Sequence, residues 1–521
     1  MSSTPPNDPD VLFDIGDSVK VQTAPLVPAG KNKTFRPYNP AQGFLLPPSL
    51  DDWLPQNHVA RFISEAVDEL LDLSDLYASY EEPAGAPPYD PRMLLKVLLY
   101  GYSVGVTSSR ALERSCINDV ACRYLAANQA PDFRSIARFR RRHLKALEGH
   151  FTQALAGCAM AGLVQLGRVA LDGTKLRASA SRHKAMSYDH IDPRLQQLQA
   201  QVRGLMAEAE MKDKAEDRRY GKQNRGDEIP AELQRRESRI AKLKQAKAAL
   251  EEEARQQVAA AAAKRCAQQG KSEQETQAAV EKAVAKAVPP PRAQRNFTDP
   301  ESRMMKMGDG SFQYGYNAQT VVDEHRQVIL ATKVTQCAGD VEQLLPMLVQ
   351  TKAALVAAGI SAVPRQLLAD AGYCSQDNLT ALDDQEVDVL IATGRLKHGE
   401  VVAAVPRGRI PKNATLTERM ARRLRTKPGK AAYARRKAIV EPAFGQMKVR
   451  QHAGALRLRG LEGAVGEWTL HALCHNLRKL ANSGVSPRCL APGMTPGVQY
   501  SPPRLLPRAP LAAWRCPATA H

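Results

Sequence analysis

The stretch GRVALDGTKLRASAS, residues 167–181, predicts a β-strand with an acidic residue at its centre. A short apolar run precedes Asp172, and Gly173 then breaks or bulges the strand before the extended pattern continues. A buried carboxylate without a partner is costly in free energy. We therefore expect Asp172 either to be paired or to hold a metal ion.

The stretch RQLLADAGYCS, residues 365–375, repeats this design. Apolar or small residues lead to Asp370, and Gly372 marks the turn that follows. Open α/β sheets carry their chemistry at such strand ends. Each aspartate alone is as consistent with a cap or a turn, but the two together favour an α/β fold with a shared site.

A third acidic residue, Glu441, lies in YARRKAIVEPAFGQMK, residues 433–448. A lone glutamate among basic residues is usually a salt-bridged surface residue, so its role depends on whether the two aspartates converge on it. Pro442 disfavours helix at the residue before it. We expect a helix that starts at Pro442, with Glu441 fixed at the helix start and Lys448 about two turns along.

Three carboxylates suffice for phosphodiester chemistry. Mg²⁺ takes oxygen ligands, keeps several waters and needs only one or two protein carboxylates. In a two-ion site, with the ions roughly 3.5–4 Å apart, one ion activates a water or hydroxyl and the other stabilises the leaving oxygen. Asp172, Asp370 and Glu441 are therefore candidate catalytic and metal-binding residues for two Mg²⁺ ions, for which Mn²⁺ could substitute.

The composition indicates a large protein with a polyanionic partner. The chain has 521 residues, more than one hydrophobic core usually serves, and a formal net charge of +19. Residues 401–460 hold 16 lysines and arginines but only two acidic residues. Ribosomal and membrane-surface proteins share a basic balance, but the interleaved aromatic and aliphatic residues favour a folded basic surface that contacts nucleic acid.

Residues 41–160 carry helical patterns, and the helix after Asp132 has a basic face. Its basic residues recur at steps of four, three and four, which puts them on one side of the helix. These DNA-binding candidates are Arg134, Arg138, Arg141 and Lys145. A solvated basic face is the alternative, but the order of helix, short turn and basic helix is typical of a helix-turn-helix unit and favours DNA.

Residues 182–295 interrupt the α/β pattern with charged helical repeats, whose leucines recur at intervals of three and four. We expect a coiled-coil-like helical hairpin that ends at the prolines 289–291; a clamp on DNA or on a partner subunit is the alternative to simple coiled-coil packing. Residues 1–40 and 485–521 lack periodicity and predict a flexible arm and a proline-rich tail.

Several residues that could bind a metal ion are expected to have structural rather than catalytic roles. Asp323 falls in a hairpin turn between two strand patterns, and Asp340 is expected to cap the next helix. His471, Cys474 and His475 lie on an apolar helical pattern without the second half of a zinc site, so core packing is favoured. The nine cysteines have no paired spacing and predict reduced thiols.

The N-terminal sequence is acidic and lacks the basic start and apolar core of a signal peptide. No apolar run reaches the roughly 18 residues that a membrane helix needs. We therefore expect a soluble, cytoplasmic protein that makes no contact with a membrane.

Three motifs resemble those of DDE transposases of bacterial insertion sequences. They are LDGTK at 171–175, ADAGY at 369–373, and Tyr433 with Glu441 and Lys448. The similarity covers roughly residues 35–480 and includes TDPESR and GYNAQ. It implies a ribonuclease-H-like catalytic core, as in retroviral integrases, formed by residues 165–181 and 296–480, with an N-terminal all-helical DNA-binding domain and an inserted helical hairpin.

The resemblance also implies roles for residues. Asp172, Asp370 and Glu441 would be the metal-binding triad. The basic and aromatic residues of the third motif would contact DNA phosphate; they are Tyr433, Arg436, Lys437 and Lys448. Four residues separate Arg436 from Glu441 where the family pattern has three, and Lys437 stands where the gap would be three.

By the same resemblance, the protein would bind the terminal inverted repeats of its element, hydrolyse DNA with Mg²⁺-activated water and transfer the freed 3′ end to target DNA. It would act as a homodimer on double-stranded DNA in the bacterial cytoplasm, associated with the nucleoid. The alternatives are a DNA-binding regulator that no longer cuts and a structure-specific nuclease on the same fold.

Overall fold

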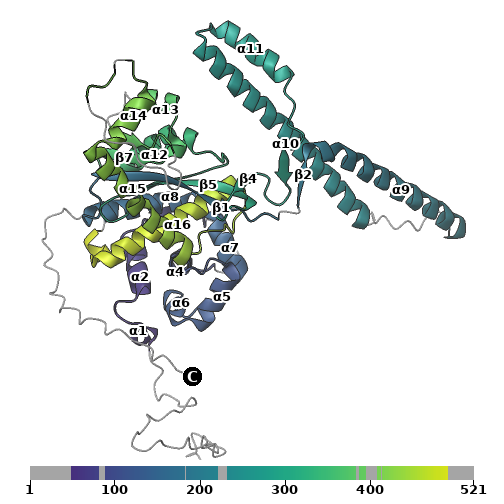
Figure 1. Ribbon diagram of the computed structural model, residues 1–521. Coiled ribbons are helices and arrows are strands. Elements are labelled where there is room, and N and C mark those ends of the chain that lie inside the picture. Colours follow the sequence, from purple (N-terminus) through teal and green to yellow (C-terminus); the bar gives the residue numbers. More distant parts are fainter. Residues whose placement is uncertain are drawn as a thin grey trace, which may run out of the picture. The chain divides into compact units, whose positions relative to one another are not determined.

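The computed structural model describes most of the chain between residues 49 and 490. The described ranges are 49–80, 88–181, 184–220, 231–382, 387–394, 408–411 and 413–490. The expected arm at 1–40 and the tail beyond residue 490 lie outside these ranges. Within the described ranges the fold is mixed α/β, as predicted (Figure 1).

The first part of the described chain is helical. Its helices are α1 (Leu50–Trp53), α2 (Val59–Glu69), α3 (Ser74–Ala78), α4 (Pro91–Val104), α5 (Ser109–Asn118), α6 (Val120–Leu125), α7 (Phe133–Arg142) and α8 (Ala146–Met160). α4 begins as expected, because the side chain of Asp90 accepts a hydrogen bond from the backbone N–H of Arg92 and Pro91 occupies the first turn. α4 ends at Gly105, whose φ of 87° suits glycine.

A mixed sheet forms the centre of the fold. Its strands are β1 (Arg168–Arg177), β4 (Arg303–Lys306), β5 (Phe312–Asp323), β6 (Ile329–Thr335), β7 (Gln366–Ala369) and β8 (Asp388–Ile391). The order is β4-β5-β1-β7-β8, with β6 also paired to β5. β1 runs antiparallel to β5 and parallel to β7, so it joins the hairpin half of the sheet to the parallel half.

Helices pack on this sheet. α12 (Leu344–Ala357) contacts β5 and β6, α15 (Lys427–Gly445) contacts β1, β5 and β7, and α16 (Gly460–Ser483) contacts β5 and β6 as well as α4 and α8. Val169, Ala170 and Leu171 in the first half of β1 are fully buried against these layers. Through α16, the N-terminal helices and the sheet share one hydrophobic core.

The segment between β1 and β4 is the predicted helical insertion. It consists of α9 (Tyr188–Tyr220), α10 (Ala231–Gln268) and α11 (Glu273–Ala285). A separate apolar cluster joins α9 to α10 and includes Leu195, Leu198, Leu243 and Leu250. A ribbon of β2 (Ala185–Ser187) and β3 (Gln294–Asn296) closes the base of the insertion, and the leucine pattern gave no indication of it.

The predicted helix start at Pro442 is wrong. α15 begins fifteen residues earlier, at Lys427, where the side chain of Thr426 accepts a hydrogen bond from the N–H of Gly429 and Pro428 lies in the first turn. Pro442 lies inside the last turns of the helix. The helix continues through Pro442, which removes one backbone hydrogen bond, because the residues around it, Ile439, Val440 and Ala443, are buried in the core.

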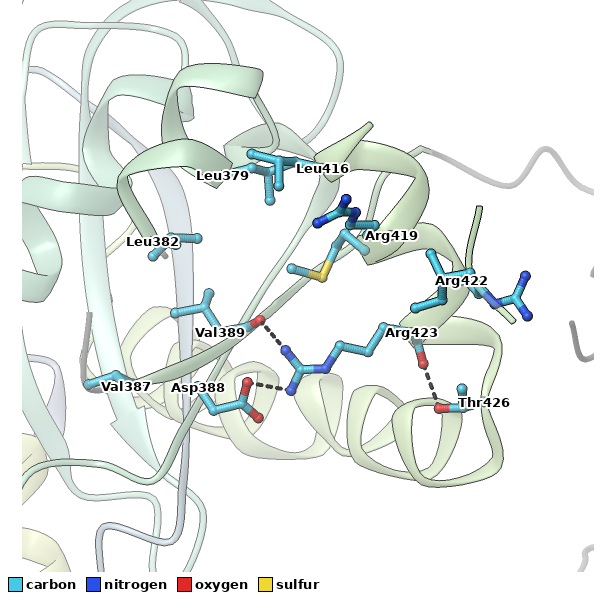
Figure 2. A pocket seen from close by; sticks show the side chains of 12 residues that line it. Leu379, Leu382, Val387, Asp388, Val389, Leu416, Arg419, Arg422, Arg423 and Thr426 are labelled. Carbon is cyan, nitrogen blue, oxygen red and sulfur yellow. Dashed lines mark hydrogen bonds and ion pairs between the residues drawn. The ribbon is translucent and has the colours of Figure 1, made fainter. Parts of the chain in front are cut away.

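The last part of the sheet carries a small cavity that lacks catalytic character. α14 (Leu416–Arg425), α13 (Gln376–Leu382) and β8 line it, largely with aliphatic side chains (Figure 2). Its single acidic residue, Asp388, is paired with Arg423, which also donates to the backbone oxygen of Val389. These contacts of Arg423 therefore hold α14 against the edge strand β8.

Candidate active site

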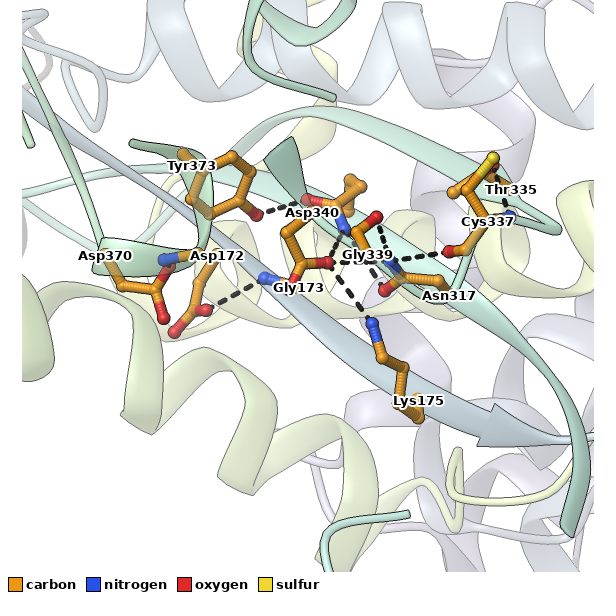
Figure 3. A network of polar contacts seen from close by, with 12 residues as sticks. Asp172, Gly173, Lys175, Asn317, Thr335, Cys337, Gly339, Asp340, Asp370 and Tyr373 are labelled. Atoms are coloured by element: carbon orange, nitrogen blue, oxygen red, sulfur yellow. Dashed lines mark hydrogen bonds and ion pairs between the residues drawn. The ribbon is translucent and has the colours of Figure 1, made fainter. Parts of the chain in front are cut away.

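Asp172 and Asp370 lie next to each other at the junction of β1 and β7. The parallel register pairs Ala170 with Leu368, so two residues further along the strands the two aspartates fall opposite one another. β7 ends at Ala369, and Asp370 starts the turn. Figure 3 shows the two carboxylates side by side.

The carboxylate of Asp172 is shielded and paired. Its Oδ2 accepts a hydrogen bond from Nη1 of Arg436 at 2.9 Å, with 23% of the Asp172 side chain and 13% of the Arg436 side chain exposed. Its Oδ1 accepts from the backbone N–H of Gly173 at 2.9 Å. Burial raises the pKa of Asp172 and the charge of Asp370 raises it further, while Arg436 and the N–H of Gly173 oppose the rise.

α15 presents a cationic face to this pair. Arg436 makes the ion pair, and its charge opposes the rise in the pKa of Tyr433 that burial causes. Desolvation lowers the pKa of Lys448, and the charge of Asp172 opposes this shift, which places the ammonium within electrostatic range of the carboxylate. Lys437 is exposed on α15 and makes no hydrogen bond or ion pair with any residue that the structure describes. Arg436, rather than Lys437, therefore faces the aspartates.

Glu441 is exposed, and no hydrogen bond or ion pair joins it to another described residue. At 3.6 residues per turn it lies about 140° around α15 from Arg436. Within the described ranges, no group of three or more histidine, cysteine, aspartate or glutamate side chains is placed to hold a metal ion. The structure thus brings Asp172 and Asp370 together and leaves Glu441 outside their pair.

The paired aspartates fit a divalent cation. Two adjacent carboxylates repel each other, and the raised pKa of Asp172 includes this repulsion. A hard cation relieves the repulsion and prefers carboxylate oxygens as ligands. The guanidinium of Arg436 already uses Oδ2 of Asp172, so a cation at that oxygen competes with it.

A second polar cluster adjoins the pair and was missed in the sequence. Oδ1 of Asp340 accepts hydrogen bonds from Nδ2 of Asn317 at 2.6 Å, Nε2 of Gln319 at 2.8 Å and Nζ of Lys175 at 3.2 Å (Figure 3). The phenol of Tyr373 donates to Oε1 of Gln319. Asp340 lies at the N-cap position of the short turn Val341–Gln343 that leads into α12, as expected, but its side chain makes no capping bond and is used by these donors instead.

Gly173 lets this cluster pack against β1. A Cβ at residue 173 would lie 2.6 Å from Nε2 of Gln319 and 2.9 Å from Oδ1 of Asp340. The register places Gly173 opposite Gln319 and Lys175 opposite Asn317. Alternating polar residues in GYNAQ were the signal for this face, whereas no local pattern indicated that Asp340 would join it.

The basic face of α7 has the predicted exposure. Arg134, Arg138, Arg141 and Lys145 are exposed, although Lys145 follows the end of α7 and precedes α8. Asp132 accepts hydrogen bonds from the N–H groups of Arg134 and Ser135 and so starts the helix.

One basic residue of α7 is buried instead. Nη1 of Arg140 donates to the hydroxyl of Tyr102 at 2.9 Å and to the backbone oxygen of Thr107 at 2.7 Å, and its Nη2 donates to Oγ of Ser109 at 3.3 Å. Arg140 therefore fastens α7 to the preceding helices.

The residues assigned to structure lie in the core. His471, Cys474 and His475 are buried in α16, and burial lowers the pKa of His471 to about 3 and of His475 to about 4. Asp323 is buried at the end of β5, where it accepts a hydrogen bond from the N–H of His325 in the turn. Their burial confirms the expected core packing of the α16 residues.

The mixed sheet, the aspartates on adjacent strands and the exposed arginine helix together define an α/β protein with an acidic pair in its sheet and a cationic helix on its surface. Comparison with protein families gives a more specific result. Residues 48–142 match a transposase domain (DUF772), and residues 285–477 match a transposase DDE domain. The chain belongs to the DDE transposases of insertion sequences.

This family has a ribonuclease-H-like catalytic domain, cleaves DNA in transposition and generally uses divalent metal ions. The second match contains Asp370 and Glu441, whereas Asp172 falls between the two matches. No curated protein and no solved structure matches the chain. None of the described helices is long and apolar enough to cross a lipid bilayer.

Proposed function

We propose that this transposase binds the terminal inverted repeats of its element, cuts DNA there and transfers the freed 3′ ends to target DNA. The observation that carries the proposal is the juxtaposition of Asp172 and Asp370, with Arg436 and Lys448 on the facing helix. Carboxylates and cations so arranged suit a reaction on a phosphodiester, because they serve the metal ion and the phosphate separately.

Asp172 and Asp370 would hold a divalent cation, with Mg²⁺ the natural choice and Mn²⁺ a substitute. When bound, metal ions supply an activated water or hydroxyl and stabilise the leaving oxygen. In two-ion sites, one ion performs the first role and the other ion performs the second. Arg436 and Lys448 then neutralise the phosphate at the cut, and half-buried Tyr433 supports Arg436 from the same helix.

Glu441 is proposed as the third carboxylate, and α15 contains the segment that would have to rearrange to bring it in. Pro442 removes one backbone hydrogen bond, and from Gln446 to Arg450 the helix continues as a π-helix. Single π-helical turns inside helices are frequent at functional sites. Binding of DNA or metal would select the arrangement in which Glu441 meets the aspartates.

The exposed face of α7 is proposed to contact the inverted repeats, with Arg134, Arg138, Arg141 and Lys145 on phosphates or base edges. Because two ends are joined in one reaction, the working form is proposed to be a homodimer on double-stranded DNA. The site of action is the bacterial cytoplasm, where the nucleoid supplies both element and target.

The test is cleavage of end-containing DNA in Mg²⁺ by three variants: Asp172→Asn, Asp370→Asn and Glu441→Gln. Each should lose cleavage and keep the gel shift of end DNA, because only the carboxylate charge is removed. Glu462→Gln, an exposed change in the first turn of α16, is the matched control and should cut normally. A variant that cuts at the wild-type rate removes its residue from the triad, and a wild-type protein that binds ends without cutting is a regulator.

A further inference from the structure

A basic cleft lies at the C-terminal end of β1, apart from the aspartates. Its volume is about 670 Å³, and no aspartate or glutamate is among the described residues that line it. The cationic lining residues are Arg177, Lys184, Arg457 and Arg459, with serine, threonine, glutamine and tyrosine side chains between them. Arg177 comes five residues after Asp172, about 16 Å along an extended strand.

Two of these arginines are held in position by the protein. Nε of Arg459 donates to the backbone oxygen of Ser179 at 3.2 Å, and Nε of Arg457 donates to Oγ1 of Thr107 at 3.3 Å. In both residues the terminal Nη groups have no hydrogen-bond partner among the described residues, and the guanidinium is exposed. A fixed guanidinium with free terminal donors matches the geometry of a phosphate.

The other two cations make no hydrogen bond or ion pair within the described part of the chain, although the charge of exposed Asp309 lies within electrostatic range of Arg177. Both side chains, those of Arg177 and Lys184, are exposed. Four like charges with no acid among the described lining residues repel one another, so the cleft favours an anion with several negative charges.

A buried chain of hydrogen bonds joins the cleft to α7. Nη1 of Arg140 donates to the hydroxyl of Tyr102 at 2.9 Å, and that hydroxyl donates to Oε1 of Glu467 at 3.1 Å. Oε2 of Glu467 in turn accepts from the backbone N–H of Arg457 at 2.7 Å. Arg140 and Arg457 also share Thr107, so the helix and the cleft are fixed relative to each other.

We propose that this cleft binds the phosphodiester backbone of DNA that is also held by α7, at a point separate from the cut. Arg177 follows Asp172 by five residues on β1, so the cleft and the aspartate pair are distinct places along one strand. The inference rests on the proposed function in taking DNA as the substrate. The cleft adds affinity that is independent of base sequence, because phosphate contacts carry no sequence information.

The experiment measures the DNA affinity of the full-length double variant Arg177→Gln/Lys184→Gln at several salt concentrations. These side chains are exposed and make no hydrogen bond with a described residue, so the substitutions should leave the fold intact. An unchanged melting temperature verifies this. The expected result is about tenfold weaker binding at 0.1 M salt, with the slope of log K against log salt reduced by about 2. The weakening should be equal for end-containing and unrelated duplexes.

The matched control is Arg326→Gln/Arg365→Gln, which removes the same charge from exposed, unbonded arginines near the other end of β1. Its affinity should change by less than about twofold, because its charges lie outside the cleft. Equal loss in both double variants would show a general charge effect and overturn the proposal, as would wild-type affinity and slope in the cleft variant. Loss confined to end-containing DNA would show base readout, which also contradicts it.

Asp172→Asn separates this inference from the active-site assignment. It should abolish cleavage and leave the salt slope unchanged, because it removes no phosphate contact. Cleavage by Asp172→Asn would refute the catalytic assignment while leaving the result for the cleft in place.

Discussion

Replacing Gly173 by alanine tests whether the polar cluster around Asp340 supports the active site. The added methyl group would lie 2.6 Å from Nε2 of Gln319, 2.9 Å from Oδ1 of Asp340 and 3.2 Å from Oδ1 of Asn317. The first two distances are shorter than carbon tolerates, so the cluster or β1 must shift. Either movement disturbs the residue next to Asp172.

The size of the effect follows from overpacking. Inserting a methyl group into a packed interior typically costs about 1–3 kcal/mol, and displacing a charge-assisted hydrogen bond costs a similar amount. Since β1 and β5 pair from Val169 to Arg177, the cost falls on the opening of this pair of strands. A cost of about 1–3 kcal/mol corresponds to a population of the locally opened state that is about 5- to 150-fold larger.

Hydrogen–deuterium exchange measured by mass spectrometry reports this opening. Peptides from β1 and β5 should lose protection in Gly173→Ala, whereas peptides from α2 should not. Gly167→Ala is the matched control, because a Cβ there meets no atom within 4 Å. Wild-type protection and wild-type cleavage in Gly173→Ala would refute the idea that the cluster holds β1 in place.

Two further outcomes are expected. Substituting Arg138 and Arg141 of α7 by glutamine should weaken binding to end DNA and lower its salt slope by about 2, as measured by titration at several ionic strengths, and an unchanged slope would move the recognition surface elsewhere. Acid should destabilise the core, because burial holds the pKa of His471 at about 3 and of His475 at about 4, below the usual 6.5. This stability is complete above pH 6.5 and is lost as the pH falls towards 4, at up to about 1.4 kcal/mol per pH unit for each histidine, so a melting temperature that is flat between pH 7 and pH 5 would contradict the assignment.

The parts of the fold that follow from local pattern were predictable. The apolar runs before Asp172 and Asp370 predicted two strands, and the structure pairs those strands in parallel with the aspartates opposite each other. The spacing of basic residues predicted the exposed face of α7. In each case the prediction depends only on the spacing of residues within a single strand or helix.

The parts that depend on tertiary contacts were not predictable. Asp340 has the sequence context of a helix cap, and only the pairing of β5 with β6 brings Asn317 and Gln319 to it, while the pairing of β5 with β1 adds Lys175. Pro442 was expected to start a helix, but the start signal at Thr426 lies upstream and a single proline does not end a helix near its last turn. The course of this helix also decides which way Glu441 points. A sequence motif specifies the spacing of its residues but not the side of the helix on which each residue lies.

The ribbon of β2 and β3 has a consequence for how this gene can change. It pairs Ala185 with Asn296, so the two ends of a segment more than a hundred residues long meet at the distance of neighbouring strands, about 5 Å. For the sheet, this segment is equivalent to the tip of a hairpin. Changes in the helices that keep the ion pairs of Glu253 with Arg303 of β4 and of Lys264 with Asp377 of α13 should leave the register of β1 and β5 untouched. The base of the ribbon is therefore the natural place to join a reporter protein, and a point at which evolution can exchange one appendage for another without rebuilding the catalytic domain.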